Sequence, residues 1–376
     1  MGLLSKTFSR AARLFSPKEL HCARRLSKSI LISTLDVRLV AVRHASSYKA
    51  AVLKQAGEPL VIEEVPRKPL KKGEVRVGVY CCGINSIDQW NVSGGEGEKI
   101  KLPYVPGYEI SGEVLEVKEG DDSPGLKPGQ RVIGMHPEFQ GGFAEEIIIS
   151  PKDLWPVNDS LSFEIGATLV NSYATALIAL SRRAEVKEGD SVLITGAGGR
   201  LGLAAVDLAA NVYRCKVIAF CTTNDKAEAV REKGAFATII QGQQDLLTEV
   251  KRANDGIGVK IIIDPVGGNV FKEAIKCLDD EAKIIVTGFA SKNIPQIGAD
   301  ELMENSFSVI GVSLDQYRKK KYDVYRDSIT EVIEMADEKL IKPYKAEGRY
   351  KLEKINEAFE ALKNSKTIGK FVINIK

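Results

Sequence analysis

The spacing of apolar residues changes along the chain and predicts two structural regions. Between residues 48 and about 165, short alternating runs are separated by turns rich in glycine and proline, which predicts a β-rich domain. Helical spacing appears at residues 163–180. From residue 191 onward, apolar strands alternate with helical stretches, which predicts a parallel sheet covered on both faces. The expected fold class is therefore α/β, with a doubly wound parallel sheet beside the β-rich domain.

Individual elements follow from the same pattern. In the first region, strands are expected at residues 49–54, 60–65 and 74–82. In the second region, strands are expected at residues 216–221, 237–240, 261–264, 283–288 and 308–312, with helices at residues 225–234 and 270–278. The last segment has an expected helix near residues 354–362 and a closing strand at residues 370–375.

Length and composition agree with a globular chain of about two domains. The chain has 376 residues, and roughly 150 residues make one domain. Hydrophobic residues make up 44% and charged residues 27%, which excludes a disordered, collagenous or coiled-coil chain. No run of 18 or more apolar residues occurs, so we expect no membrane span. The six cysteines include no C-x-x-C pair, so neither a disulfide framework nor a zinc ribbon is expected.

Charge is distributed unevenly between the first 47 residues and the rest. The formal charge of the chain is +3, but residues 1–47 contain nine basic and two acidic side chains, a local charge of +7. The remaining 329 residues carry 44 basic and 48 acidic groups, a charge of −4, so nucleic acid is not an expected partner. Residues 1–47 can form an amphipathic helix rich in arginine and serine, which is typical of a mitochondrial presequence cleaved near residues 43–47. A basic tail with another partner is the alternative.

A glycine-rich turn between a predicted strand and a predicted helix carries the clearest functional signal. Its residues are Gly196, Ala197, Gly198, Gly199, Arg200, Leu201 and Gly202. Such a turn exposes backbone N–H groups at a helix N-terminus, where the pyrophosphate of a dinucleotide binds. Arg200 stands where a small or aliphatic residue is expected, and it would either contact the pyrophosphate from outside or face solvent.

The residues after the next predicted strand favour NADPH over NADH. An NAD site has an acidic residue about 20 positions beyond the glycine turn, where it bonds the ribose 2′-hydroxyl. Here the strand that ends at Cys221 is followed by Thr222, Thr223 and Lys226, whose hydroxyls and ammonium suit a 2′-phosphate. Asp225 would repel a phosphate if it pointed inward, and would be harmless as a helix N-cap that points away.

Seven ordered motifs resemble the medium-chain dehydrogenase/reductase superfamily, specifically its zinc-free, ζ-crystallin-like quinone oxidoreductase branch. The motifs are residues 82–88 (CGINSID), 103–112 (PYVPGYEISG), 129–132 (GQRV), 141–145 (GGFAE), the glycine turn, 264–268 (DPVGG) and 369–370 (GK). The resemblance implies a GroES-like catalytic domain formed by residues 48–170 and 315–376. It also implies a Rossmann NADPH-binding domain formed by residues 171–314, with the active site between the two.

The resemblance further implies that the chain lacks the catalytic zinc of the related alcohol dehydrogenases. Their ligand positions fall on Asn85, on Tyr108 and near Asn171, and amide and phenol groups are poor zinc ligands at neutral pH. Without a metal, alcohol oxidation lacks its Lewis acid. The remaining chemistry is hydride transfer from NADPH to an acceptor that is already electrophilic, either a quinone or an α,β-unsaturated carbonyl.

The resemblance also assigns roles to single residues. The candidate catalytic residues are Asn85, which would hydrogen-bond the developing negative charge, Tyr108, and Trp90, which stands where the family commonly has a tyrosine facing the pocket. An indole cannot release a proton, so Trp90 would form a flat apolar wall or be a core residue. We call Thr222, Thr223 and Lys226 the phosphate corner. Outside the glycine turn and this corner, the candidate cofactor-binding residues are Asn85, Thr175, Gly288, Phe289, Ser308, Gly311 and Lys370.

Together these features predict a zinc-free NADPH-dependent reductase of a small quinone or enone, located in the mitochondrial matrix. An NADPH-binding protein with little catalysis, in a sensory, structural or RNA-associated role, is the alternative, because no committed general acid is evident. By analogy with the family, a homodimer formed through edge strands near residues 307–314 is expected.

Overall fold

The computed structural model describes residues 46–95, 100–118, 120, 125–304, 306–344, 348–363 and 368–376. The predicted presequence lies outside these residues, except for its last two positions. The described residues form three sheets. The smallest has two strands, β1 (Ser47–Val52) and β2 (Val61–Pro66).

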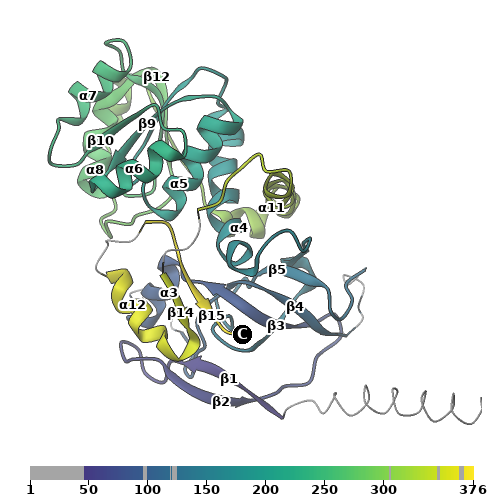
Figure 1. The fold of residues 1–376 in the computed structure, drawn as a ribbon. Coiled ribbons are helices and arrows are strands. Elements are labelled where there is room, and N and C mark those ends of the chain that lie inside the picture. Colours follow the sequence, from purple (N-terminus) through teal and green to yellow (C-terminus); the bar gives the residue numbers. More distant parts are fainter. Residues whose placement is uncertain are drawn as a thin grey trace, which may run out of the picture. The chain divides into compact units, whose positions relative to one another are not determined.

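A sheet of seven strands contains both early and late segments of the chain (Figure 1). Its strands are β3 (Val75–Gly83), β4 (Glu109–Val117), β5 (Arg131–Met135), β6 (Glu146–Ile149), β7 (Leu154–Pro156), β14 (Gly348–Lys351) and β15 (Phe371–Asn374). The order is β14-β15-β3-β4-β5-β7, with β6 paired to β3, and every pair except β14–β15 is antiparallel. Because β15 pairs with β3, the residues just before β15 lie beside the residues that follow β3.

The third sheet has six strands, all parallel, in the order β10-β9-β8-β11-β12-β13. Its strands are β8 (Ser191–Ile194), β9 (Lys216–Cys221), β10 (Ala237–Ile240), β11 (Val259–Asp264), β12 (Leu278–Val286) and β13 (Ser308–Gly311). The α-helices of the described residues are α3 (Ser86–Val92), α4 (Phe163–Leu177), α5 (Arg200–Asp207), α6 (Asn224–Glu232), α7 (Leu246–Ala253), α8 (Gly268–Ala274), α9 (Ala299–Glu304), α10 (Leu314–Lys320), α11 (Tyr322–Asp337) and α12 (Ile355–Lys363).

Both faces of the parallel sheet are buried, as the predicted strand and helix alternation requires. Successive residues of a strand point to opposite faces. Val192 and Ile194 of β8 pack in a core that includes residues of α4, α5 and α6, whereas Leu193 packs in a second core with residues of α7 and α8. Figure 1 shows these helices around the sheet. The predicted α/β fold class is therefore confirmed.

The predicted elements are present, most of them with shifted ends. β9 and β10 begin and end at the predicted residues, whereas β12 begins at Leu278, before the predicted residue 283. Helix α11 lies in a stretch for which no element was predicted.

The helix that begins with α4 is long and apolar enough to cross a membrane by length and composition alone. It spans Phe163–Ala184, but 78% of its most apolar 18-residue stretch is buried inside the protein. Burial of this kind is typical of the core helix of a globular protein, because its apolar side chains already have protein neighbours. The helix therefore gives no support to a membrane span.

Candidate active site

The glycine turn joins β8 to α5, in the strand–turn–helix order that the sequence predicts. Gly196 has a φ of +54°, in the left-handed region that favours glycine. A Cβ on Gly202 would lie 2.5 Å from the carbonyl oxygen of Gly196, so a side chain there would push α5 away from the turn. A Cβ on Gly199 would meet only that same oxygen, at 3.2 Å. No side-chain atom lies within 4 Å of the Gly199 Cβ position, so this part of the turn fits a pyrophosphate.

The end of β9 forms a polar corner beside this turn. The Nζ atom of Lys226 lies 3.3 Å from the Oγ1 atom of Thr222, to which it donates a hydrogen bond. The side chain of Lys226 passes over Gly198, where a Cβ would lie 2.5 Å from the lysine Cβ. Burial lowers the pKa of Lys226. The structure therefore brings the predicted phosphate corner and the glycine turn together.

Thr223, rather than Asp225, is the N-cap of α6. Its Oγ1 atom accepts a hydrogen bond of 3.3 Å from the backbone N–H of Lys226. Asp225 lies exposed in the first turn of the helix. The side chain of Asp225 is thus exposed rather than turned inward, but Thr223 and not Asp225 caps the helix.

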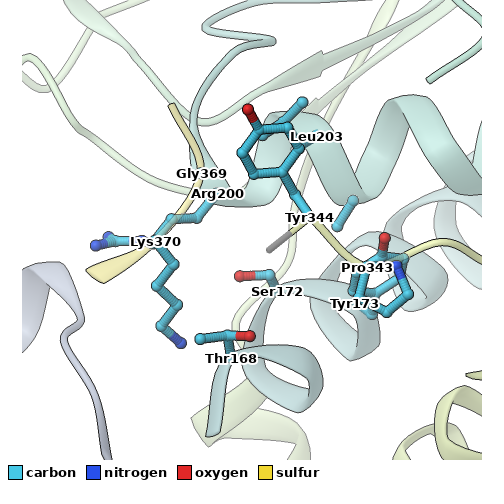
Figure 2. Close-up of a pocket in the computed structure, with 10 residues that line it drawn as sticks. Thr168, Ser172, Tyr173, Arg200, Leu203, Pro343, Tyr344, Gly369 and Lys370 are labelled. Carbon is cyan, nitrogen blue, oxygen red and sulfur yellow. The ribbon is translucent and has the colours of Figure 1, made fainter. Parts of the chain in front are cut away.

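A pocket lies beside the glycine turn (Figure 2). Its volume is about 320 Å³ when the space open to solvent is included. The residues that line it are Thr168, Ser172, Tyr173, Arg200, Leu203, Ala204, Pro343, Tyr344, Gly369 and Lys370. The backbone N–H of Gly369 donates to the carbonyl oxygen of Gly198 at 3.4 Å, so the segment before β15 is joined to the turn. The pocket brings together Arg200 and Lys370, which the sequence assigned to the cofactor on separate grounds.

Asn85 lies between β3 and α3 and is held by three polar neighbours. It is 2% exposed. Its Nδ2 atom donates to the Oε2 atom of Glu109 at 3.0 Å, and its Oδ1 atom accepts from the Nδ2 atom of Asn171 at 3.2 Å. Its backbone N–H donates to the Oδ2 atom of Asp88 at 2.7 Å. Both the backbone and the amide of Asn85 are therefore held in place.

Glu109 and Lys370 form a buried ion pair next to Asn85. Their side chains are 0% and 5% exposed, and the Lys370 ammonium donates to the same Oε2 atom that accepts from Asn85. The backbone N–H of Asn171 donates to the other oxygen, Oε1, at 3.1 Å. Burial lowers the pKa of Lys370, and the negative charge of Glu109 opposes that shift. Lys370, predicted to bind the cofactor, is thus committed to Glu109 in this structure.

Asp88 is a second buried carboxyl group at this site. Besides the N–H of Asn85, it accepts the backbone N–H of Gly107 at 3.1 Å. Burial raises its pKa to about 7, although both N–H groups favour the ionised form. Asp88 therefore connects the loop that carries Asn85 to the segment that precedes Tyr108.

The three positions that correspond to zinc ligands hold neutral side chains. Asn85 and Asn171 are in contact, whereas Tyr108 is 4% exposed and packs edge-on against Phe139, with ring centroids 4.9 Å apart. Burial raises the pKa of Tyr108 well above its ordinary value. No group of three or more His, Cys, Asp or Glu side chains is placed to hold a metal within the part of the chain that the structure describes. Zinc independence stays a prediction.

Trp90 lies on α3 and is 39% exposed. A Cβ on Gly95 would lie 2.3 Å from its ring, so the backbone of Gly95 covers the indole. Among the described residues, no hydrogen bond or ring contact joins Trp90 to Asn85 or Tyr108. The exposed fraction argues against a core role, and the structure gives Trp90 no direct link to the Asn85 network.

Three of the candidates for the nicotinamide end lie near the carboxyl end of β12, and a fourth does not. Gly311 pairs with Val286 at the carboxyl end of β12, and Gly288 and Phe289 follow that end directly. Phe289 is 43% exposed. Ser308 pairs with Lys283, three residues before the carboxyl end of β12 and therefore about 10 Å from it. The structure therefore brings Gly288, Phe289 and Gly311 together, but not Ser308.

Thr175 lies one helical turn beyond Asn171 on α4. Its Oγ1 atom donates to the Asn171 carbonyl oxygen at 2.7 Å, and it is 6% exposed. This places Thr175 on the same helix as a residue that contacts Asn85.

Several residues of the site had no role assigned from the sequence. They are Asp88, Glu109 and Asn171 around Asn85, and Thr195 and Asp264 at the carboxyl ends of β8 and β11, where the threonine hydroxyl donates to the aspartate. Asp88, Glu109 and Asp264 are each 0% exposed. In the sequence, each of these carboxylates stands beside apolar residues, which indicates burial. A buried carboxylate requires hydrogen-bond or charge partners, so this pattern could have marked them as members of a polar network.

Comparisons with known proteins agree with this architecture. Residues 71–159 match the alcohol dehydrogenase GroES-like domain family, and residues 201–334 match the zinc-binding dehydrogenase family. The chain is 41% identical over 332 residues to the quinone oxidoreductase-like protein 2 homolog of Nematostella vectensis, which covers 88% of this chain and 90% of that protein. It is 37% identical over 330 residues to quinone oxidoreductase-like protein 2 of Bos taurus, with 88% and 93% covered.

A solved structure shows the same fold. Escherichia coli quinone oxidoreductase, solved in complex with NADPH, superimposes with a TM-score of 0.77 at 24% identity, over 88% of this chain and 100% of that one. The identity to the Nematostella relative over most of both chains shows the family: the chain belongs to the medium-chain dehydrogenase/reductase superfamily and, within it, to the quinone oxidoreductase-like protein 2 group.

Proposed function

We propose that this protein is a zinc-independent, NADPH-dependent oxidoreductase that transfers hydride to a quinone or an α,β-unsaturated carbonyl. Relatives named for quinone oxidoreductase activity support the reaction class, and the E. coli enzyme of the same fold was solved with NADPH. The open space at Gly199 fits the pyrophosphate, and Thr222, Thr223 and Lys226 would hold the 2′-phosphate.

The orientation of the Asn85 amide carries the proposal for the reaction. When bound, NADPH supplies the hydride. The Asn85 amide has two N–H groups, of which one donates to Glu109, while its oxygen is occupied by Asn171. No second acceptor for Nδ2 is found among the described residues. We propose that the remaining N–H donates to an acceptor oxygen on which negative charge develops.

Protons reach the reduced acceptor from water in this scheme. The raised pKa of Tyr108 makes its phenol a poor acid at neutral pH, so Tyr108 is proposed as a hydrogen-bond donor near the acceptor. Trp90, exposed beside Gly95, is proposed as an apolar wall for a flat acceptor.

Zinc has no proposed part in the reaction, although residues 201–334 match a family named for zinc binding. Zinc prefers thiolate, imidazole and carboxylate ligands, and the corresponding positions hold Asn85, Tyr108 and Asn171. Metal analysis of the active protein tests this point: stoichiometric zinc, lost together with activity on chelation, would overturn it.

Stopped-flow oxidation of NADPH by the purified protein, with 9,10-phenanthrenequinone and with alkenals, tests the reaction. Wild type should turn over at least one acceptor class. Asn85→Ala should slow hydride transfer about 100-fold, whereas Asn158→Ala, at an exposed asparagine, should leave it unchanged. Tight NADPH binding without turnover of any acceptor would instead establish the alternative, a cofactor-binding protein with little catalysis.

We also propose a mitochondrial matrix location, supported by the +7 charge and composition of residues 1–47. A fluorescent fusion to the full chain should enter mitochondria, and a fusion that begins at Tyr48 should not. Equal import of the two fusions would contradict the presequence.

A homodimer is proposed through the β13 edge of the parallel sheet. β13 is the last strand of its sheet, and Val309 on it is 38% exposed. Sedimentation velocity should show a dimer, and Val309→Lys should shift the protein toward the monomer.

A further inference from the structure

Arg200 joins the glycine turn to the loop that carries Asn85. Its Nη1 atom donates to the carbonyl oxygen of Ile84 at 3.2 Å, and its Nη2 atom donates to the hydroxyl oxygen of Ser86. These two acceptors flank Asn85 in the chain. The sequence allowed Arg200 either an outside contact with the pyrophosphate or a position in solvent, and the structure instead turns it toward this loop.

The two ends of this connection belong to the two functional parts of the site. Arg200 is the first residue of α5, directly after the Gly199 N-cap, so its backbone is part of the turn proposed to hold the pyrophosphate. The loop at the other end is held on its far side by the contacts of Asn85 with Glu109 and Asp88. No other described side-chain hydrogen bond joins the 84–86 loop to the glycine turn. Arg200 is thus the direct side-chain link between Asn85's loop and the turn, beside the longer link that runs through Gly369, Lys370 and Glu109.

The chemistry of the contact suits arginine better than lysine. A guanidinium is planar, stays charged and presents a fork of N–H groups that can reach two acceptors at once. Burial lowers the pKa of Arg200, and the neighbouring Tyr108, Glu109 and Asp88 oppose that shift. A lysine would keep the charge but could not reproduce both contacts in one plane.

We propose that Arg200 is a positioning residue that sets the Asn85 amide relative to the bound dinucleotide. By holding the chain on both sides of Asn85, Arg200 makes the placement of that amide depend on the glycine turn. The inference rests on the proposed function, because the turn must hold the dinucleotide and Asn85 must face the acceptor. It assigns to Arg200 an effect on hydride transfer through Asn85, and only a small effect on the affinity for NADPH.

Four variants test this assignment: Arg200→Ala, Arg200→Lys, Ser86→Ala and the double variant Arg200→Ala/Ser86→Ala. Hydrogen–deuterium exchange without NADPH should speed up in residues 84–92 of Arg200→Ala, while residues 216–221 stay as in wild type. The single-turnover rate at saturating NADPH should fall about tenfold, because a hydrogen bond to a charged group is lost, while the Kd for NADPH changes less than about threefold. Arg200→Lys should recover part of the rate.

The double variant should be no slower than Arg200→Ala alone, because Ser86 acts only as the acceptor of Arg200. A large rise in the Kd for NADPH, with unchanged exchange and an unchanged saturated rate, would make Arg200 a pyrophosphate ligand and overturn the proposal. Unchanged values in all measurements would also overturn it. If wild type bound no NADPH, the proposed function would fail, whereas the exchange of residues 84–92 would still test the connection itself.

Discussion

The Nδ2 atom of Asn85 lies 3.0 Å from the Oε2 atom of Glu109, and the same oxygen accepts from the Lys370 ammonium. All three side chains are at most 5% exposed, so water does not compete for these hydrogen bonds. The buried ion pair and Asn171 thus hold the two ends of the Asn85 amide. In the proposed reaction, the remaining N–H of that amide donates to the acceptor, and the ion pair helps to hold the amide in that orientation.

Replacing one member of the buried pair should destabilise the protein. In Glu109→Gln, the Lys370 ammonium stays buried without its counter-charge, and we expect a loss of about 3 to 5 kcal/mol in the free energy of unfolding, measured with urea. The double variant Glu109→Gln/Lys370→Met should be more stable than Glu109→Gln, because it removes the unpaired charge. A single variant as stable as wild type would show that the pair is not required.

The phosphate corner predicts a difference between the two cofactors. Lys226→Ala should weaken NADPH about 10- to 100-fold and NADH far less, because a charged hydrogen bond to the 2′-phosphate is lost only with NADPH. Fluorescence titration with both cofactors measures this. Lys216→Ala, at the opposite end of β9, is the matched control and should change neither affinity. Equal losses for NADPH and NADH in Lys226→Ala would contradict the assignment.

Two glycines of the turn should respond differently to alanine. In Gly199→Ala, the added Cβ meets only the Gly196 oxygen at 3.2 Å and enters the open space, so NADPH should bind at least tenfold more weakly while stability falls by about 1 kcal/mol. In Gly202→Ala, the Cβ would lie 2.5 Å from the same oxygen, so α5 must move and stability should fall more. Thermal unfolding and cofactor titration separate the two effects. The reverse ranking in stability would argue against this geometry.

Asp88 should make stability fall as pH rises. Its pKa is raised to about 7 in the folded protein, against about 3.9 in an unfolded chain. Between these values the folded state binds the proton more tightly, so the free energy of unfolding should decrease by at most about 1.4 kcal/mol per pH unit from about pH 4 to pH 7. Asp88→Asn should lose this slope. Urea unfolding of both proteins at several pH values gives the difference, and parallel curves would contradict the assignment.

Local patterns in the sequence were sufficient for the fold class and the glycine turn. Both depend on residues close together in the chain: side-chain alternation within a strand, glycine in place of residues that would clash, and the switch from strand to helix spacing. The proximity of Thr222 and Lys226 after β9 could be predicted for the same reason, because both lie within one turn of a helix start. The exposed position of Asp225 depended on which neighbour caps α6, and the sequence left this open.

Only the tertiary structure decided which side chains meet at the site. Asn85 contacts Glu109, 24 positions away, and Lys370 contacts the same carboxylate across 261 positions. Pairing with β12 places Gly311, rather than Ser308, beside Val286 at the carboxyl end of that strand. The direction of the Arg200 side chain likewise depends on acceptors more than 100 positions earlier. The sequence by itself therefore determined the elements and the cofactor turn, which are governed by neighbouring residues. The folded chain decided the polar network around Asn85, because long-range packing places its partners.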